Sequence, residues 1–230
     1  MAVEKFIEKL KDNNIGLSDK QLNQFEQYRK LLQEYNKKIN LTAIVETDEI
    51  YMKHFYDSLI PSFHHEIKGS LLDVGAGAGF PSLPLKIIYP DLDITILEPI
   101  TKRTNFLEVV TKALSLDVKI INERAEDFIK ETSIKYDFVT ARAVANMQIL
   151  SELCIPFVKV DGYFIAMKGS RYQQELDLSI NALKQLRSSL INVYEDTLEG
   201  AVRATIIIQK NATTPSKYPR NYSQIKQKPL

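Results

Sequence analysis

Three glycines at alternate positions, Gly75, Gly77 and Gly79, form the segment whose residue types point most directly to chemistry. They follow an apolar run that ends in Asp73, and a helical pattern begins just after them at Pro81. Glycine has no Cβ, so the backbone here can turn sharply and come close to a ligand. The order strand, glycine loop, helix is typical of doubly wound α/β domains that bind nucleotides. The segment therefore predicts a nucleotide site.

The spacing of this loop favours one kind of nucleotide. Dinucleotide-binding domains carry G-x-G-x-x-G with a pyrophosphate on the helix N-terminus, whereas the pattern here, G-x-G-x-G, is one residue shorter. Asp73 stands two positions before the first glycine, where a carboxylate would repel a pyrophosphate and attract a cationic sulfonium ligand with an amino group. The sequence thus favours S-adenosylmethionine over NAD. A glycine-rich turn that binds nothing is the competing interpretation.

Two further strand ends carry acidic residues that suit the same ligand. Glu98 ends the second predicted strand, where its carboxylate would accept hydrogen bonds from ribose hydroxyls. Arg124-Ala125-Glu126 follows the third strand and would face the ligand crevice, where Glu126 or the nearby backbone addresses an adenine edge. Glu126 is equally a favourable charge in the first turn of a helix. Both interpretations of Glu126 stay open.

The segment after the fourth strand, which contains Arg142 and Asn146, bears on the methyl acceptor. It lacks the Asn/Asp-Pro-Pro-aromatic tetrad common in enzymes that methylate exocyclic amines. Cys154, the only cysteine, suits a buried core position better than a nucleophile. Guanine N7 needs neither proton removal nor covalent activation, and positioning would suffice for its methylation. We expect Arg142 at the catalytic site, donating to guanine O6 or to phosphate; a structural ion pair is the alternative.

Other basic and polar residues are candidate contacts to an RNA substrate. Lys168 closes the fifth strand and Arg171 opens the next helix, so both suit phosphate contacts, and Asn146 after the fourth strand is a further candidate RNA contact. The basic C-terminal segment, which contains Arg220, would follow RNA by charge and stacking. Solvated turns and a solvated terminus are the simpler alternatives. His54 is more simply explained as a packing residue.

The elements that must position these residues fall into three regions. Residues 1–65 show helical periodicity, with a capping-box pattern at Ser18 and Gln21 and a third predicted helix from about Asp48 to Pro61. Residues 66–210 alternate between strand and helix patterns, and residues 211–230 are predicted to be a basic extended tail. We predict strands at 70–74, 93–98, 118–121, 136–141, 162–168, 190–197 and 202–209. The last two strands form a hairpin, which gives an α/β sheet of seven mostly parallel strands, as in class I methyltransferases.

Composition excludes several other classes of protein. The 230 residues carry a formal net charge of +1, one cysteine and three histidines, so an internal disulfide is impossible and a structural zinc site is not expected. Since no apolar run approaches the ~20 residues that span a bilayer, we expect no membrane contact. The N-terminus lacks a secretory pattern. We therefore expect a cytoplasmic protein without a metal, and a monomer.

Taken together, these motifs resemble one bacterial family over essentially the whole chain. The matching segments are Asn40-Leu-Thr-Ala, His54-Phe-Tyr-Asp-Ser-Leu, Asp73-Val-Gly-Ala-Gly-Ala-Gly-Phe-Pro, Arg124-Ala-Glu, Ala141-Arg-Ala, Lys168-Gly, and the closing Tyr218-Pro-Arg and Lys228-Pro-Leu. The pattern is similar to that of the glucose-inhibited division protein B family. This resemblance implies an S-adenosylmethionine-dependent methyltransferase that acts on N7 of one guanine in 16S ribosomal RNA. It places the family's cofactor contacts on Gly75, Phe80, Ala125, Glu126 and Arg142.

Three rival functions remain to be compared with this prediction. A dinucleotide-dependent oxidoreductase is disfavoured by the short glycine spacing and by Asp73. A methyltransferase for another RNA site, a protein or a small molecule is not excluded by the residues themselves, because a net charge of +1 does not require RNA. A non-catalytic RNA-binding protein with a vestigial cofactor fold would not need an acidic ribose partner, yet Glu98 is present.

Overall fold

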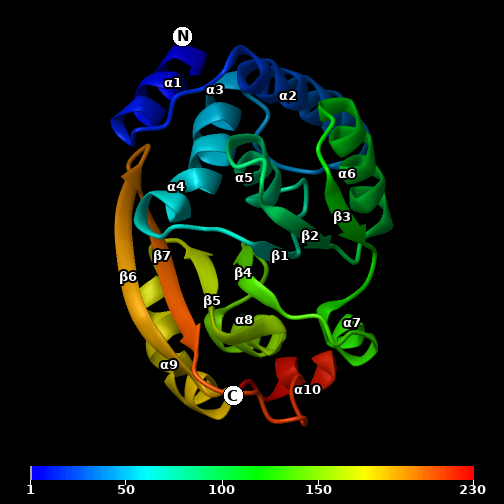
Figure 1. Cartoon of the computed structure of the whole chain (residues 1–230), viewed down its shortest axis with the longest axis vertical. Helices are drawn as coiled ribbons and strands as arrows, with labels where there is room; N and C mark the ends of the chain where they lie inside the picture. The colour runs from blue at the N-terminus through cyan, green and yellow to red at the C-terminus, as the bar shows by residue number, and fades with distance from the viewer. Residues whose placement is uncertain (1) are drawn as a thin grey trace.

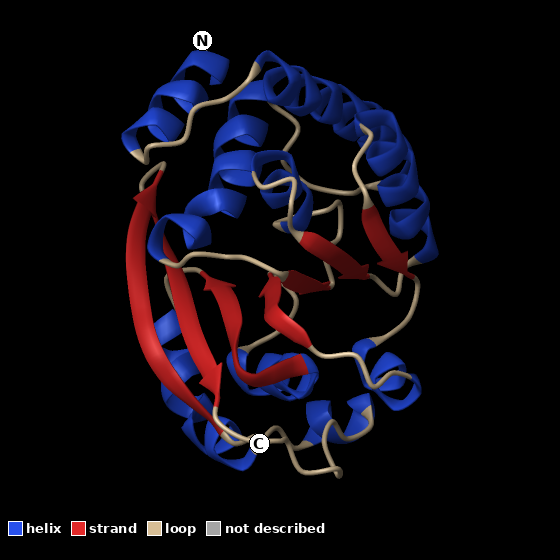
Figure 2. Cartoon of the chain, in the orientation of Figure 1, coloured by secondary structure: helices blue, strands red, loops and turns tan. Residues whose placement is uncertain are grey.

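One mixed sheet crosses the middle of the molecule (Figures 1 and 2). Within residues 2–230, the part of the chain that the computed structural model describes, seven strands form this sheet in the order β3-β2-β1-β4-β5-β7-β6. They are β1 (Ser70–Val74), β2 (Asp93–Leu97), β3 (Val118–Ile121), β4 (Tyr136–Arg142), β5 (Val158–Lys168), β6 (Ser188–Leu198) and β7 (Ala201–Lys210). Strands β1 to β5 pair in parallel, and β7 is antiparallel to β5 and β6. The predicted sheet class and its C-terminal hairpin are confirmed.

Helices cover both faces of the sheet in two layers (Figure 1). The upper layer in that view contains α1 (Ala2–Asp12), α2 (Asp19–Ile39), α3 (Thr47–Glu49), the π-helix η1 (Ile50–Tyr56), α4 (Asp57–His64), α5 (Ser82–Ile88) and α6 (Thr101–Leu114). The lower layer contains α7 (Ala125–Glu131), α8 (Met147–Cys154), the short 3₁₀ helix η2 (Ile155–Phe157), α9 (Tyr172–Gln185) and α10 (Tyr222–Gln227). Alternate residues of a strand face opposite layers: Leu71 belongs to the upper core and Leu72 to the lower core.

The N-terminal helices reach the glycine loop through aromatic residues. Ser18 and Gln21 form the predicted capping box of α2. Phe25, Tyr28 and Phe55 are fully buried in the upper core, and the Tyr28 hydroxyl donates to the Ala78 carbonyl over 2.5 Å. The helices before β1 therefore hold the loop that follows it.

The third predicted N-terminal helix differs from expectation. The sequence predicts one helix from about Asp48 to Pro61, but the structure divides it into α3, η1 and α4. In the π-helical part the Asp57 N–H donates to the Met52 carbonyl, five residues earlier, and to the His54 carbonyl. Such wide turns are frequent at functional sites. A 3.6-residue hydrophobic period does not distinguish a π-turn from continuous α-helix, because one additional residue hardly alters the pattern over so short a segment.

The C-terminal residues also differ from the predicted extended tail. Residues Tyr222–Gln227 form α10, whose Ile225 is fully buried. Just before it, Arg220 makes two side-chain hydrogen bonds to Glu152, at 2.9 and 2.6 Å. Glu152 is itself fully buried, so its charge needs a partner. This pairing explains why the segment folds against α8 although its composition suggests a solvated tail.

Candidate active site

Two adjoining cavities lie at the carboxyl ends of the parallel strands, where α/β sheets bind ligands. The small cavity, of about 220 Å³, is lined by Val74, Gly75, Leu97, Glu98, Pro99, Ile100, Arg103, Glu123, Arg124, Ala125, Glu126, Ala143, Val144, Leu153 and Tyr222. The large cavity, of about 600 Å³, is lined by Ile44, Lys53, His54, Asp57, Ile60, Arg142, Ala143, Val144, Ala145, Asn146, Met167, Lys168, Gly169, Arg171, Glu175, Arg203, Ala204 and Thr205. Ala143 and Val144 line both, so they form a shared wall.

The glycine loop is too crowded for side chains at two positions. Gly75 has φ +74°, and a Cβ there would lie 2.8 Å from Val144 Cγ2. Gly79 has φ +102°, and its Cβ would lie 2.7 Å from the Tyr28 hydroxyl. Both the left-handed backbone and the close neighbours exclude larger residues. The loop can therefore pass between α2 and the shared wall only as glycine.

Three carboxylates line the small cavity, and they differ in their partners. Glu98 is 1 % exposed and accepts from the Gly77 N–H at 2.9 Å and from the Ile100 N–H at 3.0 Å. Glu126 accepts from Arg124 Nε at 2.6 Å. Glu123 Oε2 is buried and has no hydrogen-bond partner among the described residues. The small cavity thus offers a free acceptor to a ligand that carries a hydrogen-bond donor.

Asp73 lies in β1, two residues before the first glycine of the loop, and outside both cavity linings. It is completely buried, its Oδ2 accepts from the Ser82 N–H at 3.2 Å, and its Oδ1 has no partner among the described residues. Burial raises the pKa of Asp73 to about 7, because removal from water disfavours the charged form. A nearby positive charge would therefore favour its ionised form.

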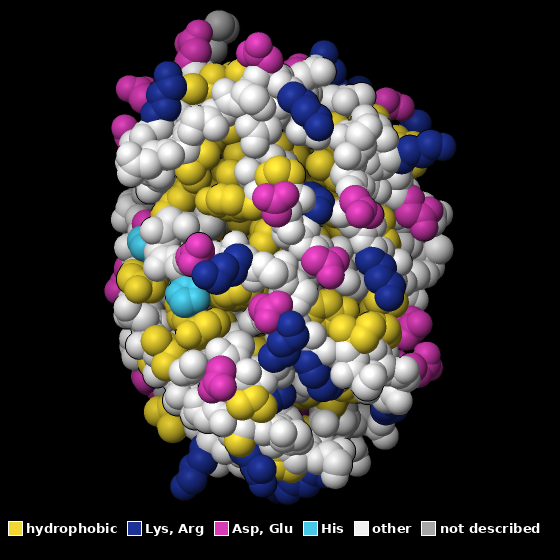
Figure 3. All heavy atoms as spheres, in the orientation of Figure 1, with side chains coloured by type: hydrophobic (Ala, Val, Ile, Leu, Met, Phe, Trp, Pro, Cys, Tyr) yellow, Lys and Arg dark blue, Asp and Glu magenta, His cyan; other side chains and the backbone are white. Residues whose placement is uncertain are grey.

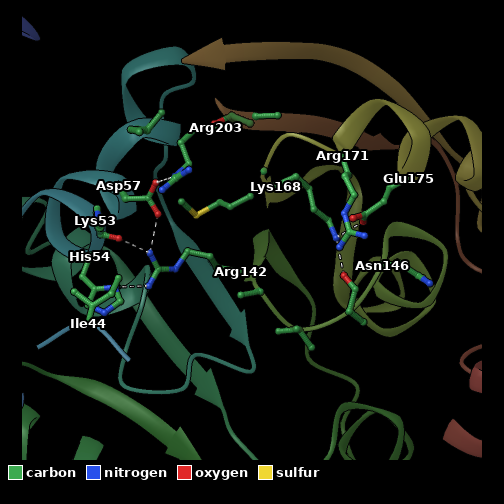
Figure 4. A pocket seen from close by; sticks show the side chains of 18 residues that line it. Ile44, Lys53, His54, Asp57, Arg142, Asn146, Lys168, Arg171, Glu175 and Arg203 are labelled. Atoms are coloured by element: carbon green, nitrogen blue, oxygen red, sulfur yellow. Dashed lines mark hydrogen bonds and ion pairs between the residues drawn. The ribbon is translucent and has the colours of Figure 1, made fainter. Parts of the chain in front are cut away.

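One end of the large cavity holds Arg142 in a fixed position (Figure 4). Its Nη1 donates to Asp57 Oδ2 at 2.7 Å and to the Lys53 carbonyl at 3.3 Å. Arg203 Nε donates to the other oxygen of Asp57 at 2.6 Å. Asp57 is 4 % exposed, so a single buried carboxylate bridges two guanidinium groups. These contacts fix the position of Arg142 within the cavity.

His54 completes the surroundings of Arg142. Its ring stacks on Phe80 at 4.4 Å, and the Arg142 guanidinium carbon lies 5.0 Å from the Phe80 ring centroid. His54 Nδ1 faces Arg142 Nη2 at 3.2 Å, and Nε2 faces Thr42 Oγ1 at 2.8 Å. Burial and the Arg142 charge lower the pKa of His54 to about 3, so the ring is neutral at pH 7. Because arginine only donates, Nδ1 accepts and Nε2 carries the proton.

The opposite end of the large cavity is also charged (Figure 4). Lys168 Nζ donates to Glu175 at 2.7 Å and to the Ala145 carbonyl at 2.6 Å. Asn146 caps α8 by accepting from the Ile149 N–H at 3.1 Å. Arg171 is exposed and forms no ion pair with a described residue. Arg171 is therefore the cation here that is free to meet a substrate.

The structure brings together most, but not all, of the predicted site residues. The small cavity contains Gly75, Glu98, Ala125 and Glu126, and the large cavity contains Arg142, Asn146, Lys168 and Arg171. Neither lining includes Asp73, Gly77, Gly79, Phe80 or Arg220. Phe80 packs behind Arg142, and Arg220 is bound to Glu152 on the lower layer. Among the described residues, no group of three or more His, Cys, Asp and Glu side chains is arranged to hold a metal ion.

Asp57, Glu123, Arg203 and Tyr222 are four of the lining residues that the sequence prediction missed. Only the family resemblance, which includes the His54-Phe-Tyr-Asp segment, could have pointed to Asp57. Arg203 and Tyr222 come from distant parts of the chain and have no local motif. Glu123 follows the same strand as Arg124, so the rule that strand ends face the crevice could have identified it.

Solved structures share the fold at low sequence identity. A methyltransferase from Pyrococcus furiosus aligns with a TM-score of 0.59 and 13% identity, over 81% of this chain and 98% of that chain. An S-adenosylmethionine-dependent methyltransferase from Clostridium acetobutylicum aligns with a TM-score of 0.55 and 11% identity, over 80% and 99%. At these identities the similarity establishes the class I methyltransferase fold and nothing about the substrate.

Curated relatives are similar over their full length. The ribosomal RNA small subunit methyltransferase G of Streptococcus suis is 47% identical over 237 residues, which cover 100% of both chains. The protein of the same name from Streptococcus pneumoniae is 47% identical over 241 residues, again covering 100% of both. The family model described as rRNA small subunit methyltransferase G matches residues 21–196. The chain therefore belongs to the GidB family of rRNA small subunit methyltransferases G.

Proposed function

We propose that this protein transfers a methyl group from S-adenosyl-L-methionine to N7 of a guanine in 16S ribosomal RNA. The observation that carries the proposal is the 47% identity over the full length to ribosomal RNA small subunit methyltransferases G. The two adjoining cavities agree with it, since a methyl transfer needs a cofactor and an acceptor on either side of a short gap.

The small cavity fits the nucleoside part of the cofactor. A Cβ-free loop at Gly75 allows close approach, and Glu98 retains acceptor capacity for ribose hydroxyls beyond its two backbone contacts. Glu123 Oε2 supplies an acceptor without a partner among the described residues, and Ala125 and Glu126 border the same space. When bound, S-adenosylmethionine supplies an electrophilic methyl group on a sulfonium.

The large cavity fits a guanine in an RNA chain. Five cationic and two anionic side chains line it, which favours a polyanion over a neutral small molecule. On the face drawn in Figure 3, Lys and Arg side chains are interspersed with Asp and Glu, so that face shows no continuous basic surface. We infer that the substrate's phosphates are recognised at the cavity, with Arg171 as the free cation and Lys168 and Asn146 shaping the wall.

Arg142 is the residue we assign to the acceptor base. Three of the five guanidinium N–H groups donate to Asp57, the Lys53 carbonyl and His54, which leaves two for guanine O6 or a phosphate. N7 has a lone pair and no proton to lose, so no general base is required. His54 is neutral and bonded on both sides, and Asp57 is paired twice. The site's contribution is therefore orientation of the base.

The substrate assignment also implies a partner and a location. We infer that the protein meets 16S rRNA or the small ribosomal subunit in the cytoplasm, and that it acts as a monomer. Among the described residues, no helix combines the length and apolar character needed to cross a bilayer.

The test is transfer of labelled methyl groups from S-adenosylmethionine to small-subunit particles, and to naked 16S rRNA, from cells that lack the protein. Borohydride reduction and aniline treatment then cut RNA at N7-methylguanine. We expect incorporation of label and one new cleavage of the RNA. Particles from cells that contain the protein are already methylated and should take up no label. Label without cleavage would overturn the N7 assignment. No label in either substrate would favour a small-molecule acceptor, and saturable quenching of NADH fluorescence would favour the oxidoreductase.

A further inference from the structure

The C-terminal segment contributes one residue, Tyr222 in α10, to the lining of the small cavity. The other lining residues come from positions 74 to 153. The guanidinium carbon of Arg124 lies 4.6 Å from the centroid of the Tyr222 ring. Arg124 also binds Glu126 at 2.6 Å, and Glu126 lines the same cavity. A chain of contacts thus runs from the C-terminal helix to the carboxylate at the cavity wall.

The C-terminal segment is anchored firmly enough to act as a wall. The Arg220 N–H donates to Glu152 at 2.8 Å in addition to the two guanidinium contacts, and Glu152 is fully buried. Ile225 is fully buried in the lower core, and Gln148 Nε2 donates to the Leu230 carbonyl at 2.8 Å. These contacts hold α10 against α8, whose Leu153 lines the small cavity. Tyr222 therefore has a defined position.

We propose that Tyr222 is a cofactor-affinity residue, and that the C-terminal segment completes the nucleoside wall of the small cavity rather than following RNA. This inference rests on the proposed function. The side chain of Arg124 is 50% exposed, so without the ring it would sample solvent and release Glu126. The ring restrains Arg124 by a cation–π contact and adds a flat apolar surface of the kind on which purines pack.

The test compares two substitutions at one position by calorimetric titration with S-adenosylhomocysteine. Tyr222→Ala should weaken binding by about two- to thirty-fold, the range expected when a cation–π contact is lost. Tyr222→Phe keeps the ring and should bind within about twofold of wild type. Ser223→Ala, the exposed neighbour in α10, is the matched control. In turnover assays the KM for S-adenosylmethionine should rise in Tyr222→Ala, while kcat and the KM for particles stay unchanged.

Several outcomes would overturn the inference. One is an unchanged affinity of Tyr222→Ala for S-adenosylhomocysteine, and another is that Tyr222→Phe weakens binding as much as Tyr222→Ala does. A third is an effect confined to the KM for particles, which would favour an RNA role for the segment. Arg124→Ala removes the same contact from the exposed side and guards against misfolding of the tyrosine variant. The double variant Tyr222→Ala/Arg124→Ala should be no weaker than the worse single variant, because both remove one contact; additive losses would contradict the proposal.

Failure of the proposed function would look different. If wild type binds S-adenosylhomocysteine but methylates neither particles nor naked rRNA, the substrate assignment is wrong. The comparison of Tyr222→Ala with Tyr222→Phe would still decide the role of the C-terminal segment.

Discussion

The two cavities differ in whether their charged groups already have partners. In the large cavity Asp57 accepts from Arg142 and Arg203, and Lys168 is bound to Glu175. In the small cavity Glu123 Oε2 is buried without a partner among the described residues. Apart from the exposed Arg171, the cationic groups of the large cavity are paired when the chain folds, whereas the small cavity leaves one buried acceptor open.

This difference separates positioning from affinity. Groups fixed by buried ion pairs keep their geometry before any ligand arrives, which suits orientation of an acceptor base. An unpaired buried acceptor gains a hydrogen bond only when a ligand supplies the donor. We therefore expect changes in the large cavity to alter turnover, and changes in the small cavity to alter cofactor affinity.

The largest effect should follow loss of the carboxylate that bridges the two arginines. Asp57→Asn leaves Arg142 and Arg203 with one neutral partner, and we expect turnover to fall by about 100-fold or more, since small misplacements in a site cost that much. Breaking a buried pair should also cost about 3–5 kcal/mol in the free energy of unfolding. Steady-state kinetics on particles and chemical denaturation measure the two effects.

Affinity for S-adenosylhomocysteine should stay within about threefold in Asp57→Asn, because Asp57 lines only the large cavity. Glu175→Gln, at the opposite end of that cavity, is the control for loss of an acidic group. If the Asp57 variant is unstable, Asp57→Asn/Arg203→Gln removes one of the two unpaired charges and should fold without regaining turnover. A loss of cofactor affinity as large as the loss of turnover would contradict the assignment of turnover to the large cavity and of cofactor affinity to the small cavity.

A smaller effect is expected from the cation that lacks an ion-pair partner among the described residues. Arg171→Ala should raise the KM for particles about tenfold at low salt and reduce the salt dependence, because one phosphate contact is lost. Cofactor affinity should not change. Lys184→Ala removes one exposed positive charge from the helix that follows Arg171, outside the cavity lining, and is the matched control. Equal effects of both variants would mean that general charge, and not a contact at the cavity, attracts the RNA.

Removing the unpaired acceptor should weaken cofactor binding modestly. Glu123→Ala should raise the dissociation constant for S-adenosylhomocysteine about fivefold, the value of one hydrogen bond, with particle KM unchanged. Glu123→Gln retains an oxygen acceptor and should bind within about twofold of wild type. Asp127→Ala, an exposed acid paired with Lys130, controls for charge. Unchanged titration curves for Glu123→Ala would show that the open acceptor is irrelevant to the ligand.

The smallest effect concerns pH. Since the pKa of Asp73 is about 7, and the cationic cofactor favours the carboxylate, S-adenosylmethionine affinity should rise about threefold between about pH 6.5 and 7.5. Asp73→Asn should remove this dependence, which calorimetry over that range would detect. His54 contributes nothing, because its pKa is about 3. A slope that persists in the variant would assign the titration to another group.

The same shift has a defined sign for stability. The folded-state pKa of Asp73 lies above the ordinary value of 3.8, so its contribution to the free energy of unfolding is present below pH 3.8 and is lost as pH rises through about 7. Asp73→Asn should therefore lose less stability than wild type between about pH 5 and pH 8 in denaturant titrations.

Local patterns along the chain were sufficient to predict the sheet and several residues of the site. The glycine loop and Glu98 directly follow strands, and Ala125–Glu126 begin the helix three residues after a strand, so the alternation of strand and helix places them at one edge. The hairpin follows from the short link between β6 and β7. The roles of the glycine loop, Glu98 and Ala125–Glu126 in cofactor binding stay predictions. The roles of Asn146, Lys168 and Arg220 in RNA binding also stay predictions.

Residues joined only by tertiary packing could not be predicted in this way. Asp57 and Arg203 lie 146 residues apart, and no local rule relates them. The C-terminal segment has a Pro-, Ser- and Lys-rich composition that suggests an extended tail, but the buried charge of Glu152 makes it fold by pairing with Arg220. Such pairings depend on which faces the layers bury, and a single sequence does not reveal that.

Because of the π-helix η1, the site depends on the number of residues in the segment Ile50–Tyr56 as well as on their types. Its Asp57 N–H to Met52 hydrogen bond closes over one more residue than the i→i−4 bond of an α-helix, and His54 and Asp57 contact Arg142 from this segment and the residue after it. If the segment became a regular α-helix with its present number of residues, the additional residue would rotate the helix on one side by about 100° relative to the other side. The arginine bridge would then be lost with every side chain of the site still present in the sequence, so an insertion or deletion scan through Ile50–Tyr56 would expose a constraint that substitutions do not reach.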